Sequence, residues 1–276
     1  MTDEAIPDAD ETAAFYDIAN QIISELWDDN FHHGYWDSDE DQSSNREASD
    51  KLTDLLIERS GDLSSGTVLD VGCGIGLATF RLAEHSGFQI TGVSNNQKQL
   101  DQANELAAQR GLADRVKFEY ADALELPYAD GTFDLVWLFE TLPHLDRLAG
   151  LREVKRVLKP GGRVVIADMF LNRQPSPEDL ALVREHEAMT AAAPMLLEHD
   201  YRDVVRESGL VLTEFKDVSP NTYRTGLCVN KALNERWNEL VERYSEAIVP
   251  MLEAFNAPAG LLPEIGYLLA VARKDG

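Results

Sequence analysis

The chain lacks several features that would assign it to a class at once. Its 276 residues include only two cysteines, Cys73 and Cys228, too few for a disulfide framework. No Cys/His cluster has the spacing of a zinc site. No apolar run reaches the roughly 18 residues that a membrane helix needs, and the N-terminus has neither the basic start nor the apolar core of a signal peptide. We therefore expect a soluble, cytoplasmic protein that holds no metal.

Basic residues are also scarce. The 25 lysines and arginines face 49 acidic residues, which gives a formal net charge of −24. Such a surface repels phosphates, so nucleic acids and anionic membranes are excluded as expected partners. Acidic residues cluster at 3–11 and 37–41, where a solvated surface is favoured over a metal site. The length and the 44% hydrophobic content predict a folded protein with an ample core.

The most informative stretch combines an apolar strand with a run of glycines. Residues 67–71 are apolar and β-branched, which predicts a buried strand. Three glycines at alternate positions follow (Gly72, Gly74 and Gly76), and residues 77–85 carry a helical apolar stripe. A ligand can approach such a turn closely, because glycine has no Cβ and the amides at a helix start attract anions. The alternative is a glycine-rich turn without a ligand.

The spacing of the glycines separates the possible cofactors. A dinucleotide fingerprint needs Gly-x-Gly-x-x-Gly/Ala, but its last position falls on Leu77 or Thr79 here. The Lys of a phosphate-binding Walker loop is also missing. The observed Asp-x-Gly-x-Gly-x-Gly resembles the first motif of the class I methyltransferases that use S-adenosylmethionine (SAM). That resemblance implies that Asp70 and the backbone of residues 72–76, including Cys73, hold the amino-acid end of SAM.

Alternating strand and helix patterns fill the rest of the chain. Strands are predicted at residues 88–93, 116–120, 133–138, 163–168, 210–218 and 264–273. Helices are predicted at residues 12–27, 45–60, 98–110, 147–158, 177–191, 198–208 and 221–256, and a Lys-Pro-Gly-Gly turn at 159–162. This order predicts an α/β fold with a doubly wound sheet. The resemblance implies seven strands, mostly parallel, with an antiparallel C-terminal hairpin.

No linker or internal repeat divides the sequence, so a single domain is expected over residues 1–276. Within it we expect a helical lid or cap at 1–60, a SAM-binding core at 61–169, and substrate-wall helices with the last strands at 170–276.

Polar residues at the predicted strand ends are candidates for cofactor contacts, because ligands of doubly wound sheets bind beyond the carboxyl ends of the strands. Ser94 follows the second predicted strand, at a position where many class I methyltransferases have an acid. The resemblance implies that Ser94 and Gln99 contact the ribose or adenosine. It also implies that Asp122, with Ala123 beside it, recognises the adenine amino group. A polar helix cap remains the alternative for residues 95–96.

Residues 28–36 gather aromatic side chains and two histidines before the glycine motif. His32, Tyr35 and Trp36 are candidates for a lid, since aromatic faces suit a sulfonium cation or an apolar substrate. A hydrophobic clasp that closes the domain is the alternative. The stretch His-x-Gly-Tyr-Trp resembles a segment of bacterial natural-product methyltransferases, such as the rebeccamycin sugar O-methyltransferase, and of tocopherol C-methyltransferases.

The segment after the fourth strand contains the catalytic candidate. Residues 140–145 resemble a Glu-Ser-Leu-His-His motif of those enzymes, but Pro143 replaces the first histidine, so a two-histidine mechanism is impossible. His144 matches the second, and a neutral imidazole is a suitable base for a hydroxyl. Asp168, at the end of the fifth strand, is expected to orient His144 or to share in deprotonation. The alternative for His144 is a histidine that caps or packs a helix start. The alternative for Asp168 is a buried helix cap.

We expect SAM-dependent methyl transfer to a small molecule, with O-methylation of a natural product in secondary or antibiotic metabolism preferred. C-methylation of a prenylated, aromatic or sterol-like compound is the second hypothesis. A cyclase built on this fold and a non-catalytic SAM-binding protein also remain open. The sequence does not identify the acceptor or the oligomeric state.

Overall fold

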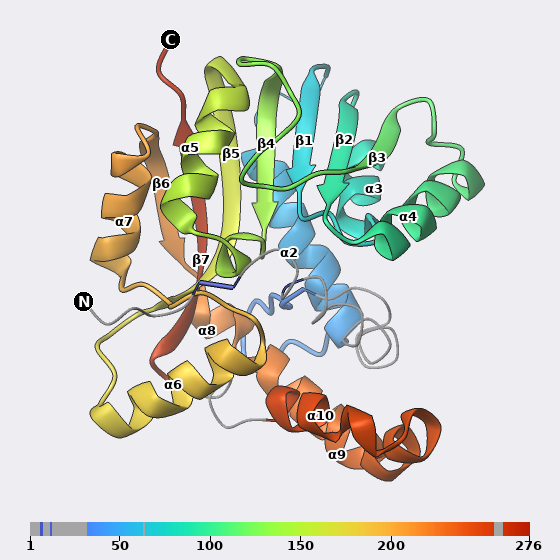
Figure 1. The fold of residues 1–276 in the computed structure, drawn as a ribbon, viewed down its shortest axis with the longest axis vertical. Helices are drawn as coiled ribbons and strands as arrows, with labels where there is room; N and C mark the ends of the chain where they lie inside the picture. The colour runs from blue at the N-terminus through green and yellow to red at the C-terminus, as the bar shows by residue number, and fades with distance from the viewer. Residues whose placement is uncertain (1–5, 8–11, 13–31, 63, 257–261) are drawn as a thin grey trace.

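A computed structural model describes residues 6–7, 12, 32–62, 64–256 and 262–276 (Figure 1). The helix expected at 12–27 falls outside the described residues except for Thr12, and so do residues 28–31. The strands are β1 (Thr67–Val71), β2 (Gln89–Ser94), β3 (Val116–Tyr120), β4 (Phe133–Phe139), β5 (Leu158–Leu171), β6 (Val211–Asp217) and β7 (Ile265–Arg273). The helices are α2 (Asn45–Arg59), α3 (Leu77–Glu84), α4 (Gln97–Gln109), the 3₁₀ turn η1 (Leu142–His144), α5 (Arg147–Val157), α6 (Pro177–Met189), α7 (Glu198–Glu207), α8 (Ser219–Thr222), α9 (Arg224–Tyr244), η2 (Glu246–Ile248) and α10 (Val249–Phe255).

The seven strands form one open sheet in the order β3-β2-β1-β4-β5-β7-β6. Strands β1 to β5 run parallel, and β7 lies antiparallel between β5 and β6. The predicted doubly wound sheet with an antiparallel C-terminal pair is therefore confirmed. The strand order reverses between β1 and β4, which are direct neighbours. Ligands of such sheets bind at this switch point, outside the carboxyl ends.

Helices cover both faces of the sheet (Figure 1). On one face, α2, α3 and α4 pack in a single core with Val68 of β1. On the other face, α5 and α7 pack with Leu69 and Val71 of the same strand. Burial on both faces explains why β1 has apolar residues on both sides (Val68, Leu69 and Val71), without the alternation of a half-exposed strand. It also leaves the ends of the strands as the edge where polar groups can gather.

Two predicted elements differ from the observed ones. The expected turn at residues 159–162 lies inside β5, where the ladder with β4 jumps from Leu158 to Arg163. The extra residues stay within the strand, where Gly161 and Gly162 exchange backbone hydrogen bonds with Lys274 of the chain's C-terminal segment, although Gly161 has a positive φ of +77°. The helix predicted over 221–256 is interrupted at Ser245, whose φ of +71° does not fit a helix.

Of the described helices, none is both long and apolar enough to cross a membrane. The helices α6, α9 and α10 lie beyond the carboxyl ends of the parallel strands in the view of Figure 1.

Candidate functional site

The three glycines of the loop after β1 have different surroundings, which the sequence does not show. Gly72, Gly74 and Gly76 all have positive φ, from +54° to +82°. A Cβ on Gly72 would clash with the side chain of Thr141, and one on Gly76 with the ring of Phe118. A Cβ on Gly74 would meet nothing within 4 Å. Two of the glycines thus allow the protein to pack on itself, and only Gly74 borders open space.

Most of the loop's amides donate hydrogen bonds inside the protein. The N–H groups of Gly72 and Cys73 both bond to the carbonyl of Val93, at 2.8 and 3.0 Å, and Gly76 N–H bonds to the carbonyl of Cys73 at 2.9 Å. These three amides are therefore already bonded within the protein, two of them to Val93 of the neighbouring strand β2. The expectation that the backbone of residues 72–76 holds the cofactor stays a prediction.

Asp70 gives the loop its charge. Its side chain is buried at the end of β1 and accepts a 2.5 Å hydrogen bond from the hydroxyl of Thr79 in α3. Burial raises the pKa of Asp70 to about 6, against the lowering effects of Thr79 and His32. The group is thus mainly ionised at pH 7. A buried carboxylate beside an open glycine suits a cationic group, such as the ammonium of an amino acid.

The end of β2 is a small polar network. Ser94 Oγ lies 3.2 Å from Oε1 of Gln99 and accepts the amide of Asn96 at 3.1 Å. Asn96 is the N-cap of α4, since its side chain accepts the amide of Gln99 at 3.1 Å. The capping alternative therefore holds for Asn96. Ser94 and Gln99 are brought together as predicted, and both carry groups that suit a ribose diol.

Beyond β3, Asp122 is exposed and its Oδ1 accepts the amide of Leu124 at 2.8 Å. Ala123 between them is partly buried. Because β3, β2, β1 and β4 are adjacent and parallel, Asp122, Ser94 and Asp70 follow one another along one edge of the sheet. The sequence-predicted cofactor residues thus share one edge.

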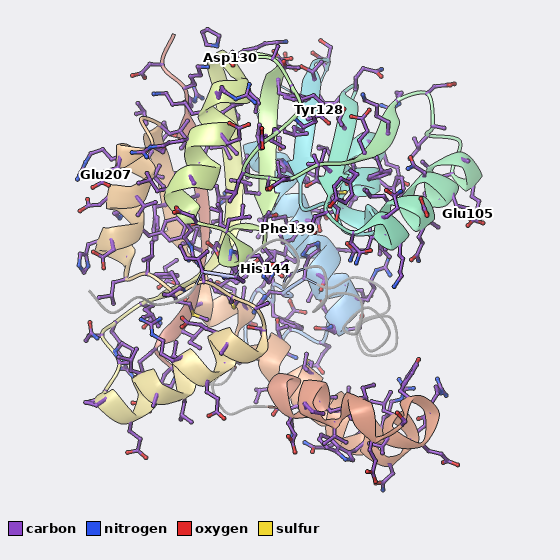
Figure 2. The ribbon with its side chains drawn as sticks, in the orientation of Figure 1. Glu105, Tyr128, Asp130, Phe139, His144 and Glu207 are labelled. Carbon is purple, nitrogen blue, oxygen red and sulfur yellow. The ribbon has the colours of Figure 1, made fainter. Side chains whose placement is uncertain are left out.

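His144 closes the 3₁₀ turn η1, just after β4. Figure 2 shows it with Phe139 at the carboxyl edge of the sheet. Its Nδ1 atom lies 2.8 Å from the carbonyl oxygen of Ala191. A carbonyl only accepts, so Nδ1 carries the proton of the neutral ring and Nε2 is the basic nitrogen. Burial lowers the pKa of His144, assisted by the charge of Arg147 and opposed by the Ala191 bond. The ring is therefore neutral at pH 7.

Asp168 has partners other than the expected His144. It is fully buried, accepts a 2.9 Å hydrogen bond from the phenol of Tyr201, and lies 3.4 Å from Nε of Arg147. Its other oxygen accepts the amide of Met169 at 2.7 Å. Burial raises the pKa of Asp168 against the opposing charge of Arg147. The bond that orients His144 comes from Ala191, so Asp168 is not needed for that task.

The described part of the aromatic segment is tied firmly to the domain. Trp36 is buried, and its indole N–H donates to the carbonyl of Ser43 at 3.0 Å. The amide of Tyr35 bonds to the carbonyl of Ala48 in α2, and that of Trp36 to the carbonyl of Asn221 in α8, both at 2.9 Å. These contacts favour the clasp interpretation over the lid for Tyr35 and Trp36.

Sequence reasoning missed one cluster. Glu140, the residue after β4, contacts the side chains of His32, His33 and Tyr267. His32 was predicted as a lid residue, whereas His33 and Tyr267 were not singled out. The sequence did place Glu140 at the end of a predicted strand, as it did Asp70, Ser94 and Asp122, and the two adjacent histidines were a second signal. Among the described residues, no group of three or more His, Cys, Asp or Glu side chains has an arrangement that could hold a metal ion.

Comparison with known proteins identifies the family. A model of the methyltransferase domain matches residues 69–166, which include the glycine loop and β4. The chain is 34% identical to 27-O-demethylrifamycin SV methyltransferase of Amycolatopsis mediterranei, over 97% of this chain and 98% of that one. It is 37% identical to methyltransferase GfsG of Streptomyces halstedii, over 96% and 94%.

Among solved structures, the [4+2]-cyclase SpnF is similar, with a TM-score of 0.86, 29% identity, and coverage of 99% of this chain and 98% of that one. The sheet, the Asp-x-Gly-x-Gly-x-Gly loop and these relatives agree. The chain belongs to the class I SAM-dependent methyltransferases.

Proposed function

We propose that this enzyme transfers a methyl group from SAM to a hydroxyl of a natural product, with His144 as the base. The observation that carries the proposal is the hydrogen bond between His144 Nδ1 and Ala191, which makes Nε2 the basic nitrogen of a partly buried, neutral imidazole. Such a group is suited to accept a proton at neutral pH. The relative 27-O-demethylrifamycin SV methyltransferase, whose name gives an O-demethyl substrate, supports oxygen as the methyl acceptor.

The residues at the sheet edge fit SAM as the cofactor. Gly74 is the one position of the glycine loop where a side chain would enter open space, and the ionised Asp70 lies close by to attract the ammonium of the amino-acid end. Ser94 and Gln99 would hold the ribose hydroxyls, and Asp122 with Ala123 the adenine. When bound, SAM supplies a methyl group already activated on a sulfonium.

The protein's own part in the reaction is then limited. It aligns the acceptor oxygen with the methyl group, which contributes roughly 7–11 kcal/mol to lowering a barrier of this kind. It also removes one proton: Nε2 of His144 would take the hydroxyl proton while the acceptor oxygen takes the methyl group from sulfur. The charges would balance, because the imidazole would gain the positive charge that the sulfonium loses.

A second candidate follows from the likeness to SpnF, a [4+2]-cyclase. Such an activity would use the methyltransferase fold without transferring a methyl group. The replacement of a histidine by Pro143 is compatible with it. We place it second, because His144 keeps the tautomer and the lowered pKa that suit a base at neutral pH.

The deciding experiment incubates the purified enzyme with SAM and a panel of macrolactone, polyketide and phenolic alcohols, followed by mass spectrometry. The expected result is the gain of one methyl group on oxygen, together with S-adenosylhomocysteine. Methylation on carbon would favour the C-methyltransferase hypothesis. An isomerised product of unchanged mass would favour a cyclase, and binding of SAM without any product would favour a non-catalytic protein.

A further inference from the structure

Glu140 occupies a backbone conformation that few side chains adopt. It follows the last residue of β4 with a φ of +54°, in the left-handed region that favours glycine. The position is fixed by a 2.8 Å hydrogen bond from its amide to the carbonyl of Ala167 in β5. Non-glycine residues persist in this region only where their surroundings hold them, often at functional sites. The contacts of the Glu140 side chain could therefore explain why this residue keeps the left-handed conformation.

The carboxylate of Glu140 collects donors from two distant parts of the chain. Its Oε1 accepts the backbone amide of His33 at 2.9 Å and the phenol of Tyr267 at 2.7 Å. The same oxygen lies 2.9 Å from Nδ1 of His33. Burial would raise the pKa of Glu140, but its interactions with His33 and His32 hold it well below its usual value. The group is therefore an ionised carboxylate, which can only accept, so Nδ1 of His33 carries a proton.

The second oxygen faces His32. Nδ1 of His32 lies 3.5 Å from Oε2 of Glu140 and has no hydrogen-bond partner among the described residues. The His32 ring stacks on Phe139, the last residue of β4, with centroids 3.7 Å apart and planes 12° apart. Figure 2 labels Phe139 at the carboxyl edge of the sheet. His32 also acts electrostatically on Asp70 at the end of the neighbouring β1.

We propose that Glu140 is a positioning residue for the cofactor: it holds the His32 imidazole across the ends of β1 and β4, with Nδ1 toward the carboxylate. With a proton on Nδ1 only, the ring presents Nε2 as an acceptor for a hydrogen bond from the ammonium of the amino-acid end of SAM. His32 and Asp70 thus recognise the same charged group from two sides. The inference rests on the proposed cofactor, but not on the acceptor or on the base.

The test compares two ligands by calorimetry. S-adenosylhomocysteine carries the amino-acid end, whereas 5′-methylthioadenosine has the same nucleoside and a thioether without it. Glu140→Gln should weaken binding of S-adenosylhomocysteine about tenfold or more, the scale of one hydrogen bond to a charged group. It should leave 5′-methylthioadenosine within about twofold of the wild type. His32→Asn should show the same selective loss, and combining the two substitutions should add little to either alone.

Glu153→Gln is the matched control. Glu153 is also a largely buried glutamate held by hydrogen bonds, to Arg156 and the amide of Leu126, but it lies on α5. Its substitution should leave both affinities unchanged. An equal loss of both ligands in Glu140→Gln would show a purely structural role and overturn the proposal. So would wild-type affinity for S-adenosylhomocysteine in that variant.

A measurement on the wild-type protein keeps the proposal testable if Glu140→Gln does not fold. ¹⁵N labelling of the six histidines reports by NMR which ring nitrogen carries the proton, with signals assigned from His→Asn variants. His32 should show the proton on Nδ1, and Tyr267→Phe, which removes one bond to Glu140, should leave it there. A proton on Nε2 of His32, in the neutral ring or in the imidazolium, would overturn the proposal. Failure to find a methyl acceptor would not change the calorimetric or NMR results. A failure of the proposed function can therefore be told apart from a failure of the role proposed for Glu140.

Discussion

His144 and Ala191 form the contact that gives the site its base: the ring Nδ1 lies 2.8 Å from the carbonyl oxygen 47 residues further along the chain. The backbone thus does what a carboxylate does in many catalytic histidines. It selects the tautomer without adding a negative charge that would raise the pKa of the imidazole. Burial then keeps that pKa low.

His144→Ala should lower kcat by two to four powers of ten, the usual scale for loss of a general base. Affinity for S-adenosylhomocysteine should change little, since His144 is not among the proposed cofactor contacts. In the wild type, kcat should fall toward acid only below about 6.5, the usual pKa of histidine, because burial lowers this pKa. Single-turnover kinetics over pH 4.5–8 would check both points. Near-normal kcat in the variant would leave alignment as the source of catalysis.

Gly74→Val should abolish binding of SAM and S-adenosylhomocysteine, because the added side chain enters the space proposed for the cofactor. The φ of +54° makes any side chain strained there, at about 1–2 kcal/mol. Gly111→Val is the matched control, since Gly111 has a φ of +67° and equally open surroundings at the end of α4. It should lose similar stability and bind normally. Calorimetry should also detect no NAD binding to the wild type. Full SAM affinity in a folded Gly74→Val protein contradicts the assignment.

Asp70→Asn should bind SAM weakly but unfold at a higher temperature at pH 7. The folded-state pKa of Asp70 is about 6, above its ordinary value of 3.8, so the folded state binds this proton more tightly than the unfolded state. Its contribution to stability is therefore largest at acid pH and declines as pH rises from about 4 to about 6. Above that range the buried charge costs roughly 3 kcal/mol, which the neutral amide avoids.

Thermal unfolding of both proteins at pH 4.5 and pH 7.5 would check this trade-off. The stability advantage of Asp70→Asn should shrink at the lower pH, where Asp70 itself is protonated. In the wild type, affinity for S-adenosylhomocysteine should weaken as pH falls below about 6. An Asp70→Asn protein that is less stable than the wild type at pH 7.5 would show that the carboxylate supports the fold.

Asp168→Asn should act mainly on stability. It removes the counter-charge of Arg147, whose side chain is only 5% exposed, and breaking one side of a buried ion pair costs about 3–5 kcal/mol. Tyr201→Phe, which removes one hydrogen bond to the same carboxylate, should cost about 1 kcal/mol. Urea denaturation would compare the two variants. A large loss of kcat at unchanged stability would instead assign Asp168 a part in the chemistry.

Residues 33–36 should exchange their amide hydrogens slowly even without ligand. All four amides are bonded: to Glu140, to the hydroxyl of Thr225, and to the carbonyls of Ala48 and Asn221. Hydrogen exchange with and without S-adenosylhomocysteine is the measurement. Fast exchange that slows only when ligand is added would favour a closing lid over the fixed clasp.

The sequence by itself determined most of the strands and helices, and it placed the candidate cofactor residues at one edge of the sheet. A β-branched run, three glycines and an apolar stripe defined β1, its loop and α3, because each signal acts within a few residues. The position of Asp70, Ser94 and Asp122 at successive strand ends followed from the same local patterns, once a parallel sheet was expected. The bulge in β5 did not, because it depends on the pairing of Gly161 and Gly162 with Lys274.

Only the tertiary structure decided which groups meet at the site. Glu140 takes its donors from residues 107 and 127 positions away, and the partner of His144 lies in a loop that no local pattern connects to it. The tertiary structure also decided that Gly72 and Gly76 pack against other side chains and that Gly74 faces open space. Local sequence sets the shape of each segment. The partners of a buried charge depend on which segments the packed core brings together, since a charge in the interior must find its counterpart there.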